Sequence, residues 1–195
     1  ALGYGVTDDT SALLAAINSF FSGVVSFVIG SYRITYTLNI DGTIQYYINF
    51  KGVGVGSRLF YDGTTASIPM VYYQGGNNAV LSTIKRLGFY NNYRTGNTVL
   101  NGIIGIRIGK KDAGATTGAG GTCNVTIEKN QIQYCDKGIE VYSESDQLSI
   151  KDNYFFVYTS YAIQTTMNPL VTSGSGNAAT RIRDNLIMGG QDGAV

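Results

Sequence analysis

The amino-acid sequence predicts an all-β protein, and more specifically a solenoid of the parallel β-helix class. Composition is the first reason, because 26 Gly, 15 Tyr and only 2 Pro in 195 residues suit many short strands joined by tight turns. The second reason is a phrase of alternating apolar and polar residues, followed by Asn, that recurs along the chain. One such unit is too short to bury its own apolar face, so parallel stacking of units must supply the core.

The first element expected is an amphipathic helix within residues 3–21. Thr7, Asp8 and Asp9 are N-cap candidates, and the two aspartates place negative charge at the positive end of the helix dipole. The apolar residues that follow would share one face of the helix: Leu13, Leu14, Ile17, Phe20 and Phe21. The sequence therefore predicts an entry loop and helix over residues 1–22, and β-helix rungs of the same domain over residues 23–195.

The rungs are clearest in the second half of the chain, where three copies of the phrase align in two columns. These columns are Ile127, Ile150 and Ile182, and Asn130, Asn153 and Asn185. A looser copy, STIKRLGFYNN, begins at Ser82. An Asn at a turn tolerates the left-handed conformation and can hydrogen-bond the next Asn in a stack, which predicts an internal ladder of asparagines. Simple turn formation is the alternative role for the same residues.

The outward positions of these strands form a column of charge: Lys85, Glu128, Lys151 and Arg183. Neighbouring rungs of a β-helix lie about 4.8 Å apart, so residues in one column are lateral neighbours. The first three residues alternate in sign, which is a favourable arrangement. Arg183 beside Lys151 would break the alternation.

Three segments near the N-terminus resemble the pectate-lyase-like superfamily of right-handed parallel β-helices, and bacteriophage tailspikes and tail fibres most of all. They are GYGVTDDT at 3–10, GSYRIT at 30–35 and FKGVGVGSRL at 50–59. The resemblance implies a right-handed solenoid whose short N-terminal α-helix caps the first rung, and it implies a homotrimer. Tyr4 departs from the family pattern, which usually has Asp at this position.

Candidate chemistry is concentrated in the segment GIEVYSESD and its neighbours in the stack. Without any His, the chain has no Ser-His-Asp or Cys-His machinery, so carboxylates would have to serve a hydrolase. The catalytic candidates are Glu140, Glu144 and Asp146, and the candidates for binding substrate are Arg107, Tyr142 and Gln164. A lyase would instead use Arg107 or Lys110 as base, with carboxylates holding calcium. A solvated polar face is the alternative to any of these sites.

Several function classes are disfavoured. The net charge of +1 does not suggest nucleic acid as a partner. No apolar run approaches the roughly 18–20 residues that span a bilayer. Residues 1–30 show no signal peptide. Two Cys without His support neither a disulfide framework nor a metal site, so no cofactor is expected apart from calcium in the lyase case. Because GGQDGAV stops within a rung, we expect a longer chain or a second subunit to cover this end.

The leading hypothesis, which depends on the resemblance, is a bacteriophage tailspike or tail-fibre domain located in the virion tail. It would bind host cell-surface polysaccharide, with depolymerisation an open question, and its partners would be two further copies of the chain and other tail proteins. The many tyrosines fit this hypothesis, since exposed rings can stack on sugars. One alternative is a secreted bacterial polysaccharide lyase or glycoside hydrolase. Another is a purely structural solenoid of a virion or adhesin.

Overall fold

The computed structural model describes residues 3–19, 21–41, 44–45, 47–74, 82–92, 102–109, 124–142, 148–166 and 180–190. The described chain begins with β1 (Tyr4–Asp8) and α1 (Thr10–Asn18), and strands make up every later element. These strands are β2 (Gly23–Ser26), β3 (Gly30–Ile34), β4 (Leu38–Asp41), β5 (Ile48–Lys51), β6 (Ser57–Tyr61), β7 (Pro69–Gln74), β8 (Ser82–Lys85), β9 (Gly88–Asn91), β10 (Ile104–Ile108), β11 (Val125–Glu128), β12 (Gln131–Tyr142), β13 (Ser149–Lys151), β14 (Tyr154–Thr166), β15 (Arg181–Arg183) and β16 (Leu186–Gly190).

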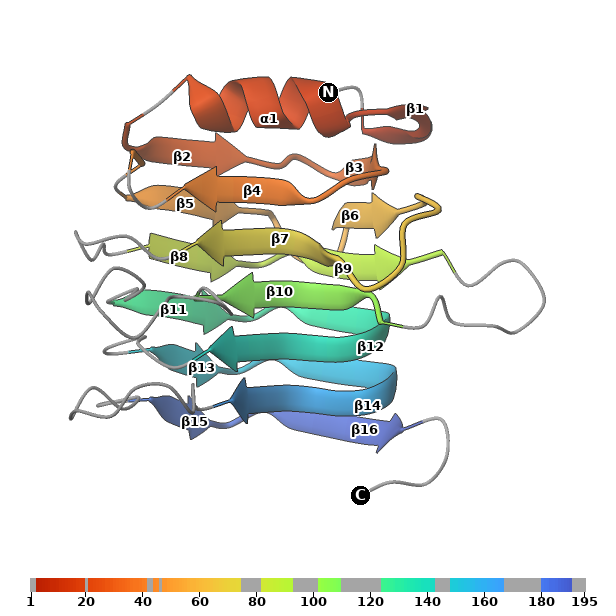
Figure 1. The fold of residues 1–195 in the computed structure, drawn as a ribbon, viewed down its shortest axis with the longest axis vertical. Coiled ribbons are helices and arrows are strands. Elements are labelled where there is room, and N and C mark those ends of the chain that lie inside the picture. Colours follow the sequence, from red (N-terminus) through yellow and green to blue (C-terminus); the bar gives the residue numbers. More distant parts are fainter. Residues whose placement is uncertain are drawn as a thin grey trace.

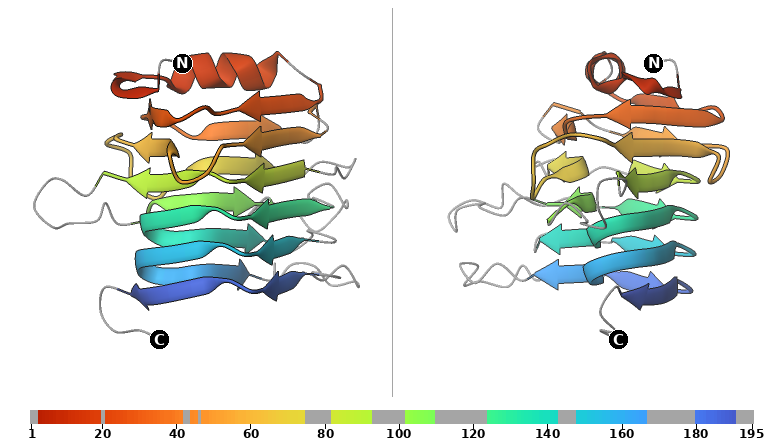
Figure 2. Two further views of the ribbon diagram at one scale, coloured as in Figure 1. Left: turned by 180° about the vertical axis from the view of Figure 1, so that it is seen from behind. Right: turned by 90° about the vertical axis from the view of Figure 1, so that its right-hand side faces the viewer.

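The strands form two parallel sheets that curl around one core. In the described residues the smaller sheet has the order β15-β13-β11-β8-β5-β2. The larger sheet has two faces joined by long strands, because β12 pairs with β9 through its first half and with β10 through its second half. Figures 1 and 2 show the strands stacked in successive layers, with α1 at one end and β15 and β16 at the other. This parallel β-helix arrangement agrees with the prediction from the repeat.

The core consists of inward residues that stack in register from rung to rung. In the smaller sheet one such column contains Phe50, Ile84, Ile127 and Ile150. In the larger sheet a second column contains Leu59, Phe89, Ile132 and Phe155. These side chains are at most 2% exposed, so each rung buries the apolar face of the next, as the alternation of the strands requires.

The N-terminal helix differs from the prediction in position and length. The sequence placed the helix in an entry segment with no strand before it, but β1 comes first and pairs in parallel with β3. Backbone bonds anchor β1, because Ser31 N donates to Gly3 O at 2.6 Å and Asp9 N donates to Arg33 O at 2.8 Å. The helix begins only at Thr10 and ends at Asn18, and Phe21, expected on its apolar face, is 72% exposed.

Asp8 and Asp9 have different roles at the junction between β1 and α1. Asp8 Oδ1 accepts hydrogen bonds from Thr10 N and Thr10 Oγ1, and its Oδ2 accepts from Thr35 Oγ1. Burial by itself would raise the pKa of Asp8, but these hydrogen bonds and the charge of Arg33 leave the pKa below its ordinary value. Asp9 occupies the N-cap position, yet its side chain makes no cap hydrogen bond. Asp8 therefore ties the start of the helix to the turn after β3.

The asparagines of the repeat form a continuous hydrogen-bonded ladder. Asn153 Oδ1 accepts from Asn130 N and Nδ2, and Asn185 Oδ1 accepts from Asn153 N and Nδ2. The turn conformation differs from what the sequence argument assumed, since positive φ occurs one residue earlier, at Lys129, Asp152 and Asp184. The left-handed residue is therefore the one before each asparagine. The asparagine side chain forms hydrogen bonds with the neighbouring rung instead.

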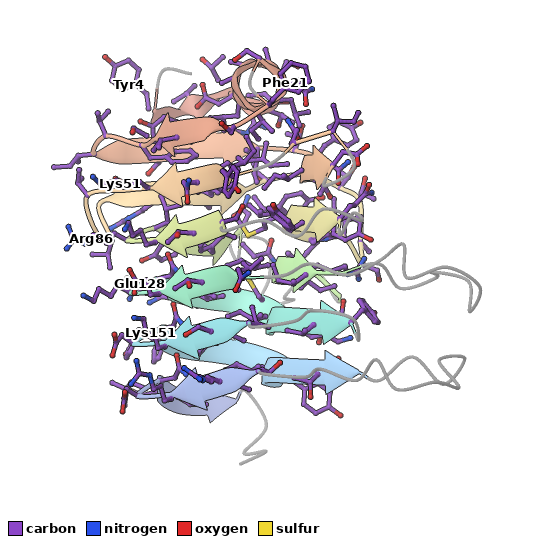
Figure 3. The ribbon with its side chains drawn as sticks, turned by 90° about the vertical axis from the view of Figure 1, so that its left-hand side faces the viewer. Tyr4, Phe21, Lys51, Arg86, Glu128 and Lys151 are labelled. Atoms are coloured by element: carbon purple, nitrogen blue, oxygen red, sulfur yellow. The ribbon has the colours of Figure 1, made fainter. Side chains whose placement is uncertain are left out.

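The outward column of the smaller sheet carries paired charges, and Figure 3 shows Lys51, Glu128 and Lys151 projecting from this side. Glu128 lies between two lysines, with Lys151 Nζ at 3.0 Å and Lys85 Nζ at 4.0 Å from its carboxylate oxygens. Arg183 is the register partner of Lys151, so like charges do meet at the last described rung. Among the described residues, no helix is long and apolar enough to cross a membrane.

Candidate functional site

The predicted column of site residues lies on the outer surface of one face of the larger sheet, which β4, β7, β10, β12 and β14 build. The register places Arg107 opposite Glu140, and Glu140 opposite Gln164. Tyr72 is the register partner of Arg107 on the preceding rung. The strand alternation thus brings together Arg107, Glu140 and Gln164, as the sequence predicted. Glu144, Asp146 and Lys110 lie outside the described residues.

Glu140 is the centre of a buried ion-pair cluster. Its side chain is 1% exposed, although it points away from the apolar core. Oε2 lies 2.7 Å from Arg107 Nε, and Oε1 lies 2.5 Å from Lys137 Nζ. The Arg107 guanidinium lies over the rings of Tyr72 and Tyr142, 5.6 Å from each centroid. Both carboxylate oxygens therefore have a cationic partner, and both aromatic rings contact one of these cations.

The electrostatics of the cluster keep Glu140 ionised. Burial by itself would raise the pKa of Glu140, but the hydrogen bonds and charges of Lys137 and Arg107 leave it below its ordinary value. Burial, and next the charge of Glu140, raises the pKa of Tyr142 to about 12. At neutral pH the cluster holds a carboxylate that accepts hydrogen bonds and a protonated phenol. A general acid would need the opposite shift of the carboxyl pKa, so in this geometry Glu140 is suited to a charge-holding role.

Two further polar atoms of this column are buried without a partner in the described part of the chain. They are Oε1 of Gln164 and Oδ1 of Asn39, at opposite ends of the column. A buried unpaired carbonyl oxygen costs about 1–3 kcal/mol relative to a paired one. The described residues contain no group of three or more Cys, Asp or Glu that could hold a metal ion. Calcium binding by the carboxylates of a lyase site stays a prediction.

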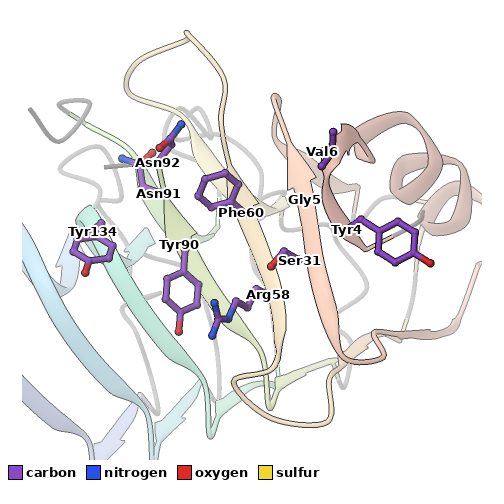
Figure 4. A pocket seen from close by; sticks show the side chains of 10 residues that line it. All are labelled: Tyr4, Gly5, Val6, Ser31, Arg58, Phe60, Tyr90, Asn91, Asn92 and Tyr134. Atoms are coloured by element: carbon purple, nitrogen blue, oxygen red, sulfur yellow. The ribbon is translucent and has the colours of Figure 1, made fainter. Parts of the chain in front are cut away.

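The structure also contains a groove that the sequence analysis did not identify. It has a volume of about 560 Å³ and lies on the other face of the larger sheet, across β1, β3, β6, β9 and the start of β12 (Figure 4). The lining residues are Tyr4, Gly5, Val6, Ser31, Arg58, Phe60, Tyr90, Asn91, Asn92 and Tyr134. The register explains how they meet, since Arg58 is opposite both Ser31 and Gly88, and Phe60 is opposite Tyr90.

Tyr90 and Arg58 hold each other in place in this groove. The Tyr90 hydroxyl donates to Gln131 Oε1 at 2.7 Å, and the Arg58 guanidinium lies 5.1 Å from the centre of the Tyr90 ring. Arg58 Nε also donates to Val55 O at 3.2 Å. The ring fits because Gly88 has no side chain: a Cβ there would lie 2.5 Å from Tyr90 Cε2. The aromatic wall of the groove is therefore fixed before any ligand arrives.

Polar side chains lie at one end of the groove, where Asn91 and Asn92 line it, and Asp62 lies beside them without lining it. Asp62 bridges two strands by accepting from Arg33 Nε at 2.8 Å and from Asn92 Nδ2. Asn91 is 2% exposed, and neither atom of its amide group has a hydrogen-bond partner among the described residues. One signal in the sequence could have pointed to this site. In GFYNN, the alternation puts the ring of Tyr90 outside, on the strand position two residues after Gly88, and this Gly leaves room for the ring.

Comparisons with known proteins bear on the fold. No family model matches the chain, and no curated protein matches it. Several solved structures are similar to this chain, among them the following three. The mannuronan C-5 epimerase AlgE6 A-module of Azotobacter vinelandii is 18% identical with a TM-score of 0.65, and the match covers 97% of this chain. The AlgE4 A-module of the same organism is 20% identical with a TM-score of 0.61 over 86% of this chain. ORF18 of Geobacillus virus E2 is 16% identical with a TM-score of 0.52 over 95%.

The chain has a parallel β-helix fold. At these identities the similarity shows the fold of the β-helix and nothing finer. The β-helix spans 55% and 51% of the two epimerase modules and 38% of the viral chain. The expected parallel β-helix fold is thus confirmed, whereas membership of the pectate-lyase-like superfamily and the resemblance to tailspikes stay predictions.

Proposed function

We propose that this β-helix binds a polysaccharide in the groove that Arg58, Phe60 and Tyr90 line. The observation that carries the proposal is the groove itself, which has a volume of about 560 Å³ and is lined by four aromatic residues together with polar groups. Aromatic rings bury the apolar faces of sugars, while amides and hydroxyls pair with sugar hydroxyls. A surface of stacked rungs also offers repeated positions to a chain of repeated sugars.

The biological setting proposed is the tail of a bacteriophage, where the β-helix would be part of a tailspike or tail fibre that recognises host surface polysaccharide. The proteins of similar fold support this setting through their names, since two are epimerases of mannuronan, itself a polysaccharide, and one comes from a virus. The same proposal includes a homotrimer, contacts with other tail proteins and a right-handed coil. Right-handed crossovers between parallel strands are the rule, which supports the handedness.

Catalysis is a second proposal and depends on a different observation, the Glu140 cluster. Two carboxyl groups could cleave a glycosidic bond, with Glu140 as the ionised carboxylate and Glu144 or Asp146 as the protonated acid. The intact protein is incubated with bacterial polysaccharides, and released fragments are identified by mass spectrometry. Unsaturated ends would indicate a lyase, and one added water per cut would indicate a hydrolase. Replacing Glu140 and Glu144 together by Gln should abolish release, and unchanged turnover would remove the cluster as the catalytic site.

The binding proposal is tested by retention of the intact protein on immobilised bacterial surface polysaccharides. Tyr90→Ala removes the central ring of the groove and should lower affinity for the retained polysaccharide about tenfold, which is the usual scale for an aromatic contact at an interface. Tyr36→Ala is the matched control, because Tyr36 is 63% exposed and does not line the groove. Equal losses of affinity in the two variants would exclude the groove as the polysaccharide-binding site. Retention on none of the polysaccharides would favour a structural stalk.

A further inference from the structure

The groove carries an unbalanced positive charge. Among the described residues that line it, Arg58 alone has a formal charge. Arg58 is exposed, and no described carboxylate lies within ion-pair distance of it. Its Nε donates a hydrogen bond to Val55 O, and its guanidinium stacks over the ring of Tyr90. The Nη atoms have no hydrogen-bond partner in the described part of the chain, so the donors best suited to an anion are still available.

The acidic residues close to these strands do not cancel this charge. Asp62 follows β6 but is paired with Arg33 at 2.8 Å and bonded to Asn92. Asp8, at the end of β1, is bonded to Thr10 and Thr35. Neither carboxylate lines the groove. An anion that enters the groove therefore meets a cation whose orientation is fixed and whose charge is not neutralised locally.

We infer that the groove selects a sugar residue with an anionic substituent, a carboxylate or a phosphate, which Arg58 binds through its Nη atoms. This inference rests on the proposed function and specifies the substrate class of the same site. The sugar ring lies against Phe60, and Tyr90 acts as a positioning residue because its ring supports the guanidinium. A planar guanidinium forms two parallel hydrogen bonds with either anion, so the geometry suits an acidic polysaccharide and gives no preference to a neutral one.

The test compares acidic polymers with their neutralised forms on the intact protein. The probes are acidic capsular polysaccharides before and after reduction of their carboxyl groups, and phosphate-bearing wall polymers before and after removal of phosphate. The two arms distinguish the two sources of negative charge. Arg58→Gln should weaken binding of the acidic form at least tenfold, as loss of a charge-assisted hydrogen bond predicts, and should change binding of the neutralised form less than about twofold.

The matched control is Arg183→Gln, which makes the same change of net charge at an exposed position on the other sheet. It should leave the preference for the acidic form intact. Equal binding of acidic and neutralised forms by the wild-type protein, or equal effects of the two variants, would overturn the inference while leaving polysaccharide binding in place. Binding of neither form of any polymer would overturn the proposed function and the inference with it.

Discussion

Asn153 and Asn130 are joined by two hydrogen bonds to a single atom. Oδ1 of Asn153 accepts from the backbone N of Asn130 at 3.0 Å and from its Nδ2 at 3.1 Å. Nδ2 of Asn153 in turn donates to Ile127 O at 2.9 Å. One side chain thus pairs three polar groups of the neighbouring rung at a buried turn.

Replacing Asn153 by Ala should therefore destabilise the β-helix strongly. The change leaves Asn130 N buried without its partner, which we expect to cost about 1–3 kcal/mol, and it also removes the bond from the Asn153 amide to Ile127 O. The measurement is the free energy of unfolding in urea, followed by circular dichroism on the intact protein.

Asn91→Ala is the matched control for the ladder prediction. Asn91 is buried to the same degree, but its amide has no partner among the described residues. Its removal should cost less than about 1 kcal/mol, because an unpaired buried amide already carries the desolvation penalty. Equal losses in the two variants would show that the hydrogen bonds of the ladder contribute nothing beyond packing.

The ladder shows what a sequence repeat can predict. Equivalent residues of a solenoid must stack, so Asn130, Asn153 and Asn185 follow from alignment of the copies. The same period-2 alternation put Arg107, Glu140 and Gln164 in one column. The assignment of left-handed φ to the asparagines was wrong, because a turn motif does not fix which of two adjacent polar residues takes that conformation.

Other features depend on contacts that no local pattern encodes. Tyr4–Asp8 resembles a helix entry segment, and it becomes strand β1 only because β3 offers an unpaired edge. The groove joins Arg58 to Tyr90, which lie 32 residues apart and on different rungs. Glu140 was expected on an exposed surface, yet it is buried, because the long side chains of Arg107 and Lys137 and the ring of Tyr142 surround it.

The second prediction concerns the pH dependence of stability. The folded pKa of Glu140 lies below its ordinary value of 4.5, so its ion pairs contribute stability that is fully present above that value. The contribution is lost as the pH falls through the lower, folded pKa. Glu140→Gln leaves Arg107 and Lys137 without their shared carboxylate and should cost about 3 kcal/mol at pH 7. The difference between wild type and variant should shrink below pH 4.5.

Comparison with the variant is necessary because Asp8 and Glu128 also have lowered pKa values and contribute to acid unfolding. Their contribution is the same in both proteins and cancels in the difference. The measurement is the urea midpoint of both proteins from pH 7 down to about pH 3. A difference that stays constant over this range would contradict the assignment of a lowered pKa to Glu140.

The third prediction separates the groove from the core by a pair of Gly→Ala changes. At Gly88 the new Cβ would meet Tyr90 Cε2 at 2.5 Å, and the ring can swing away because it is outside the core. At Gly138 it would meet Ala162 O at 2.5 Å and the Phe155 ring at 2.6 Å, both fixed by packing. We expect Gly138→Ala to cost about 2–3 kcal/mol of unfolding free energy and Gly88→Ala about 1 kcal/mol or less.

Loss of polysaccharide affinity should be greater in Gly88→Ala than in Gly138→Ala, which is the reverse of the order expected for loss of stability. Gly88→Ala displaces the ring that supports Arg58, so it should weaken retention several-fold at a temperature where both variants are folded. Gly138→Ala should leave retention unchanged, because Gly138 is in β12 and does not line the groove. Loss of retention in Gly138→Ala alone would place the binding surface elsewhere.

The last prediction concerns Cys135, a free thiol that is 1% exposed. Burial, together with the charge of Asp136, raises the pKa of this thiol to about 12, so almost no thiolate is present at neutral pH. In a Cys123→Ser background the native protein should react with a disulfide reagent at least a hundredfold more slowly than the urea-unfolded protein, given roughly three pKa units between this thiol and a free one. Arg183→Cys in the same background supplies an exposed thiol for comparison and should react at the rate of the unfolded chain. Rapid reaction of Cys135 in the native state would mean that β12 opens locally, and the rungs on either side of it would then be less tightly packed than the stacked core requires.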